Sequence, residues 1–450
     1  MKNKFCYAIA ISFIFINTAY AEKALTLDEC KSLALQNNIS IRNGSLEMES
    51  ARKVKSSAFT KYFPRVSAGA FAFKMKDPVI DESVSEVNLP VYDGNPASLA
   101  TASEFAYFPG MDITAVEKGK TGYASAVQPV FAGGRIFNGN RLASIGVEVS
   151  ELKNKMYRDE VLLGTEEQYW QIVSLNEKMK TVLRYEELLD RLSKQVEDAY
   201  NAGISMKNDV LKVRQKKNEV ELNKSKLENG MQLASMAFCQ YIGVPYDPSI
   251  VFTDKVVIDD KPESIYIDSS KVIANRNEYK LLKICVEAEE LKTKLKLGEY
   301  MPEIGVGVGA FYTKIDDYDW IDNKMVFASA TIPVSDWWDA TYSLKERKTQ
   351  EKIQENNKKD KTELLLLQME KAWTDLGDAY RQLSLSEVSR AQAEENLNVS
   401  RDSFNNGVTD ISDLLEAQAV FQQAEDQLIG AKSSYRVKQI YYMQVTGRGF

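Results

Sequence analysis

Few residues of this 450-residue chain are placed to do covalent chemistry. Gly305, Gly307 and Gly309 have the spacing of a nucleotide-binding loop, but they alternate with apolar residues as in a strand, and no helix is expected after them. The chain has no histidine, which removes the commonest general base and the commonest zinc ligand. Carboxylates such as Asp77 and Glu86 lie in a polar stretch without convincing partner groups. The sequence therefore predicts no catalytic site, no cofactor and no metal site.

The first 21 residues have the pattern of an export signal. Two lysines precede the apolar run 8–16, and Ala19-Tyr20-Ala21 fits an A-x-A cleavage site. We expect cleavage before Glu22, and because this residue is not cysteine we expect no lipid anchor. The apolar run is too short to span a bilayer, and no other stretch approaches the length of a membrane helix.

Charge and cysteine content argue against a disulfide-stabilised protein and against a nucleic-acid-binding protein. After cleavage three cysteines remain, Cys30, Cys239 and Cys285, and an odd number cannot all pair internally. We interpret them as small apolar fillers on helices. The net charge of −7 argues against nucleic acid as a partner, because binding phosphate requires a basic face.

The chain is internally duplicated. Residues 200–205 (YNAGIS) match 404–409 (FNNGVT), and 240–243 (QYIG) match 444–447 (QVTG), both at an offset of 204 residues. A fixed offset over such a distance indicates two copies of one structural repeat.

The first half of each repeat aligns at a different offset. Tyr62-Phe63-Pro64 matches Tyr300-Met301-Pro302 at 238 residues, which indicates a 34-residue insertion in repeat one. The insertion falls between Lys74 and Gly122, in a stretch rich in Pro, Gly, Ser and acidic residues that predicts a long exposed loop.

Each repeat is expected to contain a helix, a strand, a loop, a strand, a long helix, a tight turn and a return helix. The tight turns are expected near Gly203 and Gly407, because glycine readily adopts positive φ. The predicted boundaries are the signal peptide at 1–21, repeat one at 22–243 with strands 62–73 and 123–131 and the long external loop 74–122, an inter-repeat linker at 244–270, and repeat two at 271–450 with strands 302–313 and 325–334.

Strands and helices show distinct periodicities. Ile304, Val306, Val308 and Ala310 alternate with glycines, which predicts a strand with one apolar face. The helices carry apolar residues at alternating steps of three and four, as in coiled coils. No proline interrupts residues 137–200, so a continuous helix there would run roughly 95 Å.

Four amphipathic strands of about ten residues have the length to cross a bilayer when tilted. They cannot close a barrel alone, because transmembrane barrels need about eight strands or more. The chain is therefore predicted to oligomerise in a membrane; two solvent-exposed hairpins on a helical rod are the alternative. Phe131, Trp337 and Trp338 follow the last strand of each repeat, where either an interfacial aromatic belt or ordinary packing would place them.

Several motifs resemble the TolC-type outer-membrane efflux proteins. Residues 25–29 (LTLDE) with 34–38 (ALQNN) look like the opening helix of that family, and 128–135 (QPVFAGGR) resembles its strand-exit motif. Gly407 followed by 413–418 (DLLEAQ) is similar to its turn-and-return motif. The likeness covers nearly all of the chain after the signal peptide.

The resemblance implies a mixed α/β membrane protein with four transmembrane β-strands and long coiled-coil α-helices per subunit. As a homotrimer it would complete a β-barrel in the outer membrane of a Gram-negative bacterium and an α-helical tunnel through the periplasm. Its function would be that of a passive exit duct for a tripartite efflux or type I secretion system. A periplasmic membrane-fusion adaptor would join it to an inner-membrane pump, and outer-membrane lipid would surround the barrel.

The resemblance also implies a gate at the periplasmic turns. Asp413 and Glu416 match positions where the family narrows its tunnel with acidic side chains, although helix capping would also explain them. Asp209 lies where the family has the acceptor of a closing bond. Phe404 and Thr409 depart from the family's tyrosine and arginine, so we expect a different lock, with apolar contact by Phe404 or a bond from Thr409 as candidates.

A second hypothesis comes from another class of protein, the exported coiled-coil adaptor that binds a channel. Adaptors have one helical hairpin flanked by compact β domains, whereas this sequence predicts two hairpins with paired strands between them. The prediction is therefore a channel subunit and not an enzyme.

Overall fold

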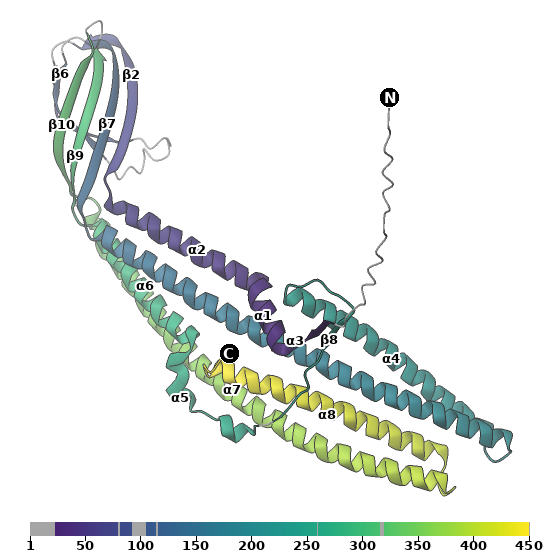
Figure 1. Cartoon of the computed structure of the whole chain (residues 1–450). Coiled ribbons are helices and arrows are strands. Elements are labelled where there is room, and N and C mark those ends of the chain that lie inside the picture. The colour runs from purple at the N-terminus through teal and green to yellow at the C-terminus, as the bar shows by residue number, and fades with distance from the viewer. Residues whose placement is uncertain are drawn as a thin grey trace, which may run out of the picture. The chain divides into compact units, whose positions relative to one another are not determined.

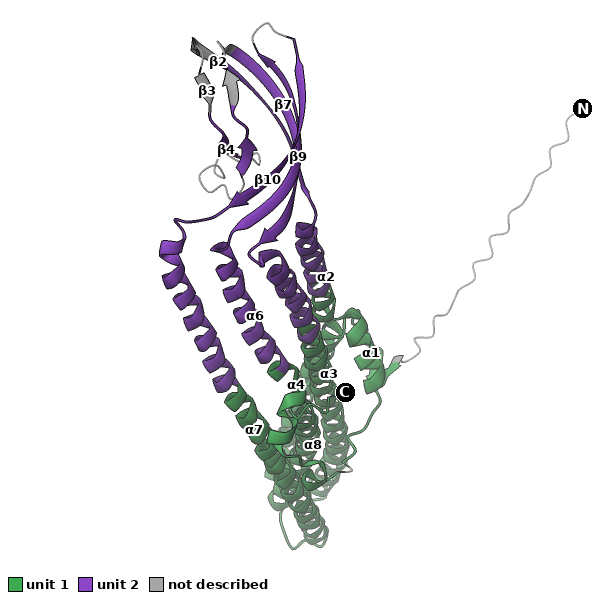
Figure 2. Cartoon of the chain, turned by 90° about the vertical axis from the view of Figure 1, so that its left-hand side faces the viewer, with its two compact units in different colours: residues 1–46, 153–279, 362–450 green, residues 47–152, 280–361 purple. Residues whose placement is uncertain are grey.

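A computed structural model of the chain describes residues 23–79, 82–91, 105–113, 116–258, 260–315 and 319–449. The predicted signal peptide at 1–21 lies outside the described residues. The chain divides into two compact units, which Figure 2 colours separately. The strand unit comprises residues 47–152 and 280–361, and the helical unit comprises residues 1–46, 153–279 and 362–450.

One antiparallel sheet of four strands forms the centre of the strand unit (Figure 1). Strands β7 and β9 pair with each other, so the hairpins from the two repeats join in a single sheet. β2 begins after Pro64 and β10 ends before Pro333, whereas Pro129 lies within β7 beside an irregularity in its pairing with β9. In spatial order the strands are β10 (Ile321–Thr331), β9 (Glu303–Ile315), β7 (Val116–Ala132) and β2 (Arg65–Val79).

The predicted loop 74–122 is wrong in part, because much of this segment is strand. β2 continues to Val79 and β7 begins at Val116. Two further strand pairs lie between β2 and β7 in the sequence. The proline, glycine and acidic residues of the segment predicted a loop, although it also holds aromatic and β-branched residues that favour strands. The pairs are β3 (Glu82–Val84) with β6 (Met111–Ile113) and β4 (Val87–Pro90) with β5 (Phe105–Phe108).

The two faces of the sheet differ in composition. One face carries small aliphatic side chains, and its valines are widely exposed in the single chain, such as Val66 (78%) and Val326 (83%). The opposite face carries glycine, serine, threonine and aromatic residues. Tyr123 lies over Gly69, and Phe327 lies over Gly307, so that a Cβ on either glycine would overlap the ring. The glycines thus let these rings lie flat against the sheet.

Long helices continue from the strands. Within the strand unit, ion pairs join neighbouring helices: Arg141 pairs with Glu287 at 3.0 Å, and Arg347 pairs with Glu289. α3 has 67 residues and therefore spans about 100 Å. The 3₁₀ helix η1 (Thr60–Tyr62) precedes β2, and the helices are α2 (Ile39–Phe59), α3 (Arg135–Asn201), α6 (Asn277–Glu299) and α7 (Trp337–Asn405).

The helical unit contains two helical hairpins. In the first hairpin α3 lies beside α4 (Lys207–Tyr241), and in the second α7 lies beside α8 (Ile411–Val445) (Figure 1). α1 (Leu27–Asn37) begins with a capping box, in which Thr26 and Glu29 exchange hydrogen bonds. The remaining elements are β1 (Lys23–Leu25) paired in parallel with β8 (Ile250–Phe252), and η3 (Pro262–Ile265), α5 (Ser269–Val272) and η4 (Ile273–Asn275) in and beside the predicted linker.

Buried apolar clusters hold the helical unit together. One cluster packs Tyr169 against Phe238 and Phe252, with ring centroids 5.5–6.1 Å apart. Another contains residues of α3, α4, α7 and α8, among them Leu189 and Leu414, and so joins the two hairpins. Among the described residues, no helix is both long enough and apolar enough to cross a membrane.

Candidate functional site

The two predicted tight turns have the same backbone geometry. We call residues 202–206 turn 1 and residues 406–410 turn 2. Gly203 has φ 77° and Gly407 has φ 71°. In turn 1 the N–H of Ile204 donates to the carbonyl of Ala199, and in turn 2 the N–H of Val408 donates to that of Ser403, both at 2.9 Å. A Cβ on either glycine would meet nothing within 4 Å, so the left-handed conformation, not space, requires glycine here.

Asp209 and Asp413 occupy equivalent positions in the two repeats but have different surroundings. The Asp209 carboxylate accepts the N–H of Met206 at 3.2 Å and the hydroxyl of Ser205 at 3.0 Å, so it caps the start of α4. In α8 the cap is instead Asp410, which accepts the N–H of Ser412 at 2.6 Å. Within the described chain the Asp413 carboxylate has no hydrogen-bond or ion-pair partner, and its side chain is exposed. Asp209 therefore caps its helix through hydrogen bonds, whereas Asp413 lies in the first turn of α8, where its charge complements the helix dipole without such a bond.

Glu416 lies three residues after Asp413 on α8 and is also exposed, while Leu414 and Leu415 between them are buried. The spacing of three places both carboxylates on one side of the helix. α8 thus buries its leucines in the hairpin cluster and presents two carboxylates outward.

A hydrogen bond joins the two hairpins beside the turns. Lys212 Nζ on α4 donates to Ser412 Oγ on α8 at 2.6 Å, and the same ammonium lies 3.9 Å from Asp209. The pKa of Asp410 is held below its usual value, first by the backbone N–H of Ser412 and then by the Ser412 hydroxyl, with a smaller contribution from Lys212. No sequence motif pointed to Lys212, Ser412 or Asp410.

Other ion pairs cross between the helices within each hairpin. In the first hairpin Arg214 pairs with Glu197 at 2.8 Å. In the second, Arg390 pairs with Glu425 at 2.6 Å. These pairs hold each hairpin as a unit, whereas the bond from Lys212 connects one hairpin to the other.

Phe404 and Thr409 do not supply a polar tie. Phe404 is half-buried and packs against the apolar cluster that joins the hairpins, so its contribution is apolar contact. The Thr409 hydroxyl oxygen is buried and has no hydrogen-bond partner among the described residues. Of the two candidates for the lock, the structure places Phe404 in contact and leaves Thr409 without a bond.

The predicted interface aromatics are largely exposed, and Phe131 lies within β7 rather than after it. Trp338 at the start of α7 is 81% exposed and Phe131 at the end of β7 is exposed. Trp337 is tied to the backbone, because its indole N–H donates to the carbonyl of Tyr300 at 2.9 Å. The structure therefore gives Trp337 a packing role and leaves Trp338 and Phe131 without one.

The strand-exit motif positions the start of α3. Gly133 and Gly134 have φ 59° and 72°, and Gly133 approaches the backbone of Gly298 so closely that a Cβ would overlap it. Arg135 follows and donates to the Glu303 carboxylate at 2.6 Å. The two glycines and the arginine thus fix the junction between β7, α3 and the start of β9.

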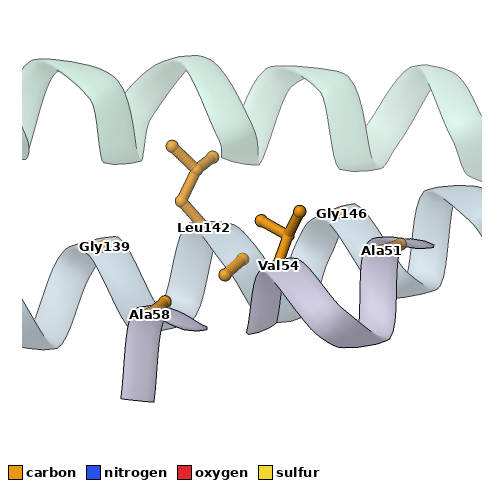
Figure 3. Close-up of a pocket in the computed structure, with 7 residues that line it drawn as sticks. Ala51, Val54, Ala58, Gly139, Leu142 and Gly146 are labelled. Atoms are coloured by element: carbon orange, nitrogen blue, oxygen red, sulfur yellow. The ribbon is translucent and has the colours of Figure 1, made fainter. Parts of the chain in front are cut away.

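The strand unit has an open apolar groove of about 440 Å³ (Figure 3). Every side-chain atom drawn there is carbon, and Val54 and Leu142 point to the same side. A groove without polar groups is suited to packing rather than catalysis. It is lined by Ala51, Val54 and Ala58 of α2 and by Gly139, Leu142, Ala143 and Gly146 of α3.

The described residues contain no cluster of three or more potential metal ligands. Cys30 and Cys239 are buried and Cys285 is half-buried, and none of the three forms a disulfide bond within the described chain. Burial raises the pKa of the Cys30 thiol to about 12, so it stays protonated at neutral pH.

Comparisons with known proteins relate part of the sequence, and the fold, to outer-membrane efflux proteins. Residues 272–448 match the family described as "Outer membrane efflux protein". The structure is similar to VceC from Vibrio cholerae, with TM-score 0.72, 13% identity and coverage of 94% of this chain and 96% of that one. It is also similar to the CmeC outer-membrane channel of Campylobacter jejuni, with TM-score 0.74, 14% identity and coverage of 94% and 86%.

A third similar structure is the open state of the MtrE outer-membrane channel of Neisseria gonorrhoeae, with TM-score 0.71, 13% identity and coverage of 94% and 88%. A search of curated proteins by sequence gave no match. The fold is that of outer-membrane efflux channels. Its motifs resemble those of TolC-type outer-membrane efflux proteins, and the family match covers residues 272–448 in the second repeat.

Proposed function

We propose that the protein is one subunit of an outer-membrane channel, the exit duct of a tripartite efflux or type I secretion system, and that transport through it is passive. The observation that carries this proposal is the four-stranded sheet of the strand unit. Among the described strands, β2 and β10 each pair on one side only. A sheet with an exposed aliphatic face and two open edges is stable in lipid when further copies close it into a barrel.

The number of subunits follows from the strand count and the family resemblance. Four strands are half of the smallest transmembrane barrel, so at least two copies are required. The resemblance favours three, which gives twelve strands. The apolar groove between α2 and α3 supports assembly, because another copy of the chain would cover it.

The turns are the proposed periplasmic gate. Exposed Asp413 and Glu416 would place six carboxylates around the opening of a trimer and favour cations. The bond between Lys212 and Ser412 would hold the two hairpins of each subunit together in the closed state. Opening would separate the hairpins while the ion pairs within each hairpin persist.

Partners and surroundings follow from the same proposal. A periplasmic membrane-fusion adaptor would contact the helices near the turns and recruit an inner-membrane pump. Trp338 and Phe131 would lie at the membrane interface. The alternative of an adaptor or scaffold protein has lost support, because the similar structures are channels and the strands form one continuous sheet.

Planar-bilayer conductance of the detergent-extracted protein tests the proposal. Wild type is compared with Asp413→Ala/Glu416→Ala, and the mass in detergent is measured in parallel. A matched control is Glu363→Ala/Glu370→Ala, which removes the same charge from α7, far along the helix from turn 2. Trimers that form small cation-selective channels, with selectivity weakened only in the first variant, would support the proposal. A soluble monomer that never inserts would contradict it.

A further inference from the structure

Lysines occupy one end of the aliphatic face of the sheet. Strands β2 and β9 begin where helices end, and β7 and β10 end where helices begin, so the adjoining helices all meet the sheet at its other end (Figure 1). Along β9 the aliphatic face continues away from the helices through Val308 and Ala310 to Tyr312 and then Lys314. On β7 the same face carries Lys120 directly opposite Lys314. Away from the helices, the face therefore changes from aliphatic to aromatic to cationic.

Lys120 and Lys314 form a like-charge pair across two strands. Residues directly opposite each other have Cβ atoms about 5 Å apart, and like charges in such a pair are destabilising. Lys120 is exposed and Lys314 is half-buried, and among the described residues neither ammonium has a hydrogen-bond or ion-pair partner. Asp322 is the one acidic residue on this face of the described sheet, and it lies opposite Tyr312 rather than either lysine. An anion from outside the described residues would relieve the repulsion.

Protection of a sheet edge does not explain this pair. Lysines on edge strands discourage pairing with other chains, and this accounts for Lys74 on β2 and Lys324 on β10. Lys120 and Lys314 instead lie on β7 and β9, which are paired on both sides. Lys74 and Lys118 also have interactions within the chain. The argument therefore rests on the central pair alone.

Exposure to water does not explain the pair either, because the charge is confined to one face. Next to the pair along the two strands, the opposite face carries the uncharged residues Gly119, Thr121, Thr313 and Ile315. The hydroxyls of Thr121 and Thr313 are hydrogen-bonded to each other at 3.2 Å. A rim with water on both sides would have no reason to place its cations on one face. The lysines lie on the face that the proposed function turns toward lipid.

Two stacked rings mark the level at which this face meets the lipid headgroups. The rings of Tyr312 and Trp320 lie 4.5 Å apart with an interplanar angle of 1°, and the two side chains are 53% and 43% exposed. Tyrosine and tryptophan favour the membrane interface, because they combine an apolar body with a polar tip. Lys314 follows two residues after Tyr312 on the same face, about 7 Å further along the strand. Its ammonium can therefore reach the layer that holds the headgroup phosphates.

We propose that Lys120 and Lys314 bind the phosphate of a lipid in the leaflet that faces away from the periplasm. The phosphate oxygens accept hydrogen bonds from both ammonium groups, and the negative charge removes the repulsion within the pair. The acyl chains of the same lipid lie along the aliphatic face, over side chains such as Val308. Each subunit supplies one such site. This inference rests on the proposed function, because it requires the aliphatic face to contact lipid.

Lipid titration of the detergent-extracted protein tests this proposal. The probes are lipid A, which bears phosphate groups, and the same lipid after enzymatic dephosphorylation. Native mass spectrometry counts the lipids bound to each trimer along the titration and so yields a dissociation constant. Lys120→Gln/Lys314→Gln removes both charges, and Lys120→Arg/Lys314→Arg retains them. The matched control is Lys352→Gln/Lys359→Gln, because these two lysines are exposed on α7.

The expected effect depends on the phosphate. Each lysine near an anionic lipid strengthens binding about fivefold, so the glutamine variant should bind phosphorylated lipid A roughly 25-fold more weakly. The arginine variant and the matched control should bind it as wild type does, and dephosphorylated lipid A should bind wild type and the glutamine variant equally weakly. In neutral detergent without lipid, the glutamine variant should be at least as heat-stable as wild type, because the like-charge pair is gone. Added phosphorylated lipid A should reverse that order.

The same samples show which hypothesis fails. An unchanged dissociation constant in the glutamine variant would overturn the proposal and would point to Asp316 and Asp317, in the connection outside the described residues, as the counter-ions. Displacement of the lipid by millimolar inorganic phosphate would overturn the choice of a lipid as the ligand. A wild-type chain that forms no trimer in the outer-membrane fraction would overturn the proposed function as well. A trimer that binds both lipids equally would overturn this inference only.

Discussion

Lys212 Nζ lies 2.6 Å from Ser412 Oγ, and this bond joins α4 of the first hairpin to α8 of the second. The two residues are 200 positions apart in the chain. Lys212 is the repeat equivalent of Glu416, since both lie nine residues after the glycine of their turn. At this position one repeat therefore supplies a cation that ties the hairpins together, and the other supplies an exposed carboxylate.

Lys212→Ala is expected to favour the open state of the channel. A hydrogen bond from a partly exposed ammonium contributes roughly 1 kcal/mol. Three such bonds in a trimer give about 3 kcal/mol, so their loss would shift the equilibrium toward the open state roughly a hundredfold. Single-channel recording should show a larger open probability. The control is Lys216→Ala, because Lys216 lies one turn further along α4 and pairs with Glu219 of its own helix. Equal behaviour of the two variants would exclude Lys212 as the tie.

The cap of α8 predicts how this tie depends on pH. The pKa of Asp410 is lowered, chiefly by the backbone N–H of Ser412, so the folded state favours the charged carboxylate. The charged Asp410 carboxylate therefore stabilises the folded state fully above the ordinary aspartate pKa of 3.8. This stabilisation is lost as the pH falls through the lower pKa that Asp410 has in the folded state. We expect conductance to be insensitive to Asp410 near neutral pH and to rise below pH 3.8.

Asp410→Asn separates the charge of this residue from its capping role, because asparagine also caps helices well. The variant should fold normally and lose the acid-induced step in conductance. Persistence of the full step in Asp410→Asn would show that another group causes it.

Periodicity and repetition predicted much of the fold. The alternation at Ile304 to Ala310 indicated β9, and the two matching glycine motifs indicated turns 1 and 2, because these signals are local and depend on backbone geometry. The structure of the insertion was not predicted correctly. Its proline, acidic and glycine content indicated a loop. The contact of Phe108 with Phe71 and Phe311 could not be predicted from local patterns, because it depends on three strands that are distant in sequence.

The candidate site was only partly predictable for the same reason. Asp209 and Asp413 match between the repeats, yet Asp209 caps its helix and Asp413 does not, because Asp410 stands where repeat one has Met206. A residue-by-residue comparison of the repeats would have revealed that substitution and the change from Lys212 to Glu416. It would not have revealed the partner of Lys212, since Ser412 comes from the packing of the two hairpins.

Gly133→Ala is expected to disrupt assembly. Gly133 combines φ 59° with a close approach to the Gly298 backbone, so alanine would be strained and would also overlap a carbonyl. We expect a loss of at least about 2 kcal/mol in stability and a lower yield of detergent-resistant trimer. Gly230→Ala is the control, because Gly230 lies in the interior of α4 with nothing within 4 Å of an added Cβ. That variant should keep or slightly gain stability, and a similar loss in both would contradict the argument from close approach.

Asp426→Asn is expected to stabilise the helical unit at neutral pH. Asp426 lies on α8, where one carboxylate oxygen is buried without a hydrogen-bond partner among the described residues. Burial is the main cause of its raised pKa; Glu425 raises it further, and Lys178 opposes the shift. Because the pKa of Asp426 is higher in the folded state than in the unfolded state, ionising this carboxyl destabilises the fold at neutral pH. This destabilisation decreases as the pH falls toward the ordinary aspartate pKa of 3.8.

The thermal midpoint of Asp426→Asn should exceed that of wild type at pH 7.5, and the difference should shrink as pH approaches 4. Asp360→Asn, at an exposed position of α7, is the control and should show no such trend. A lower midpoint for Asp426→Asn at neutral pH would show that the carboxylate has a favourable partner in the assembled channel.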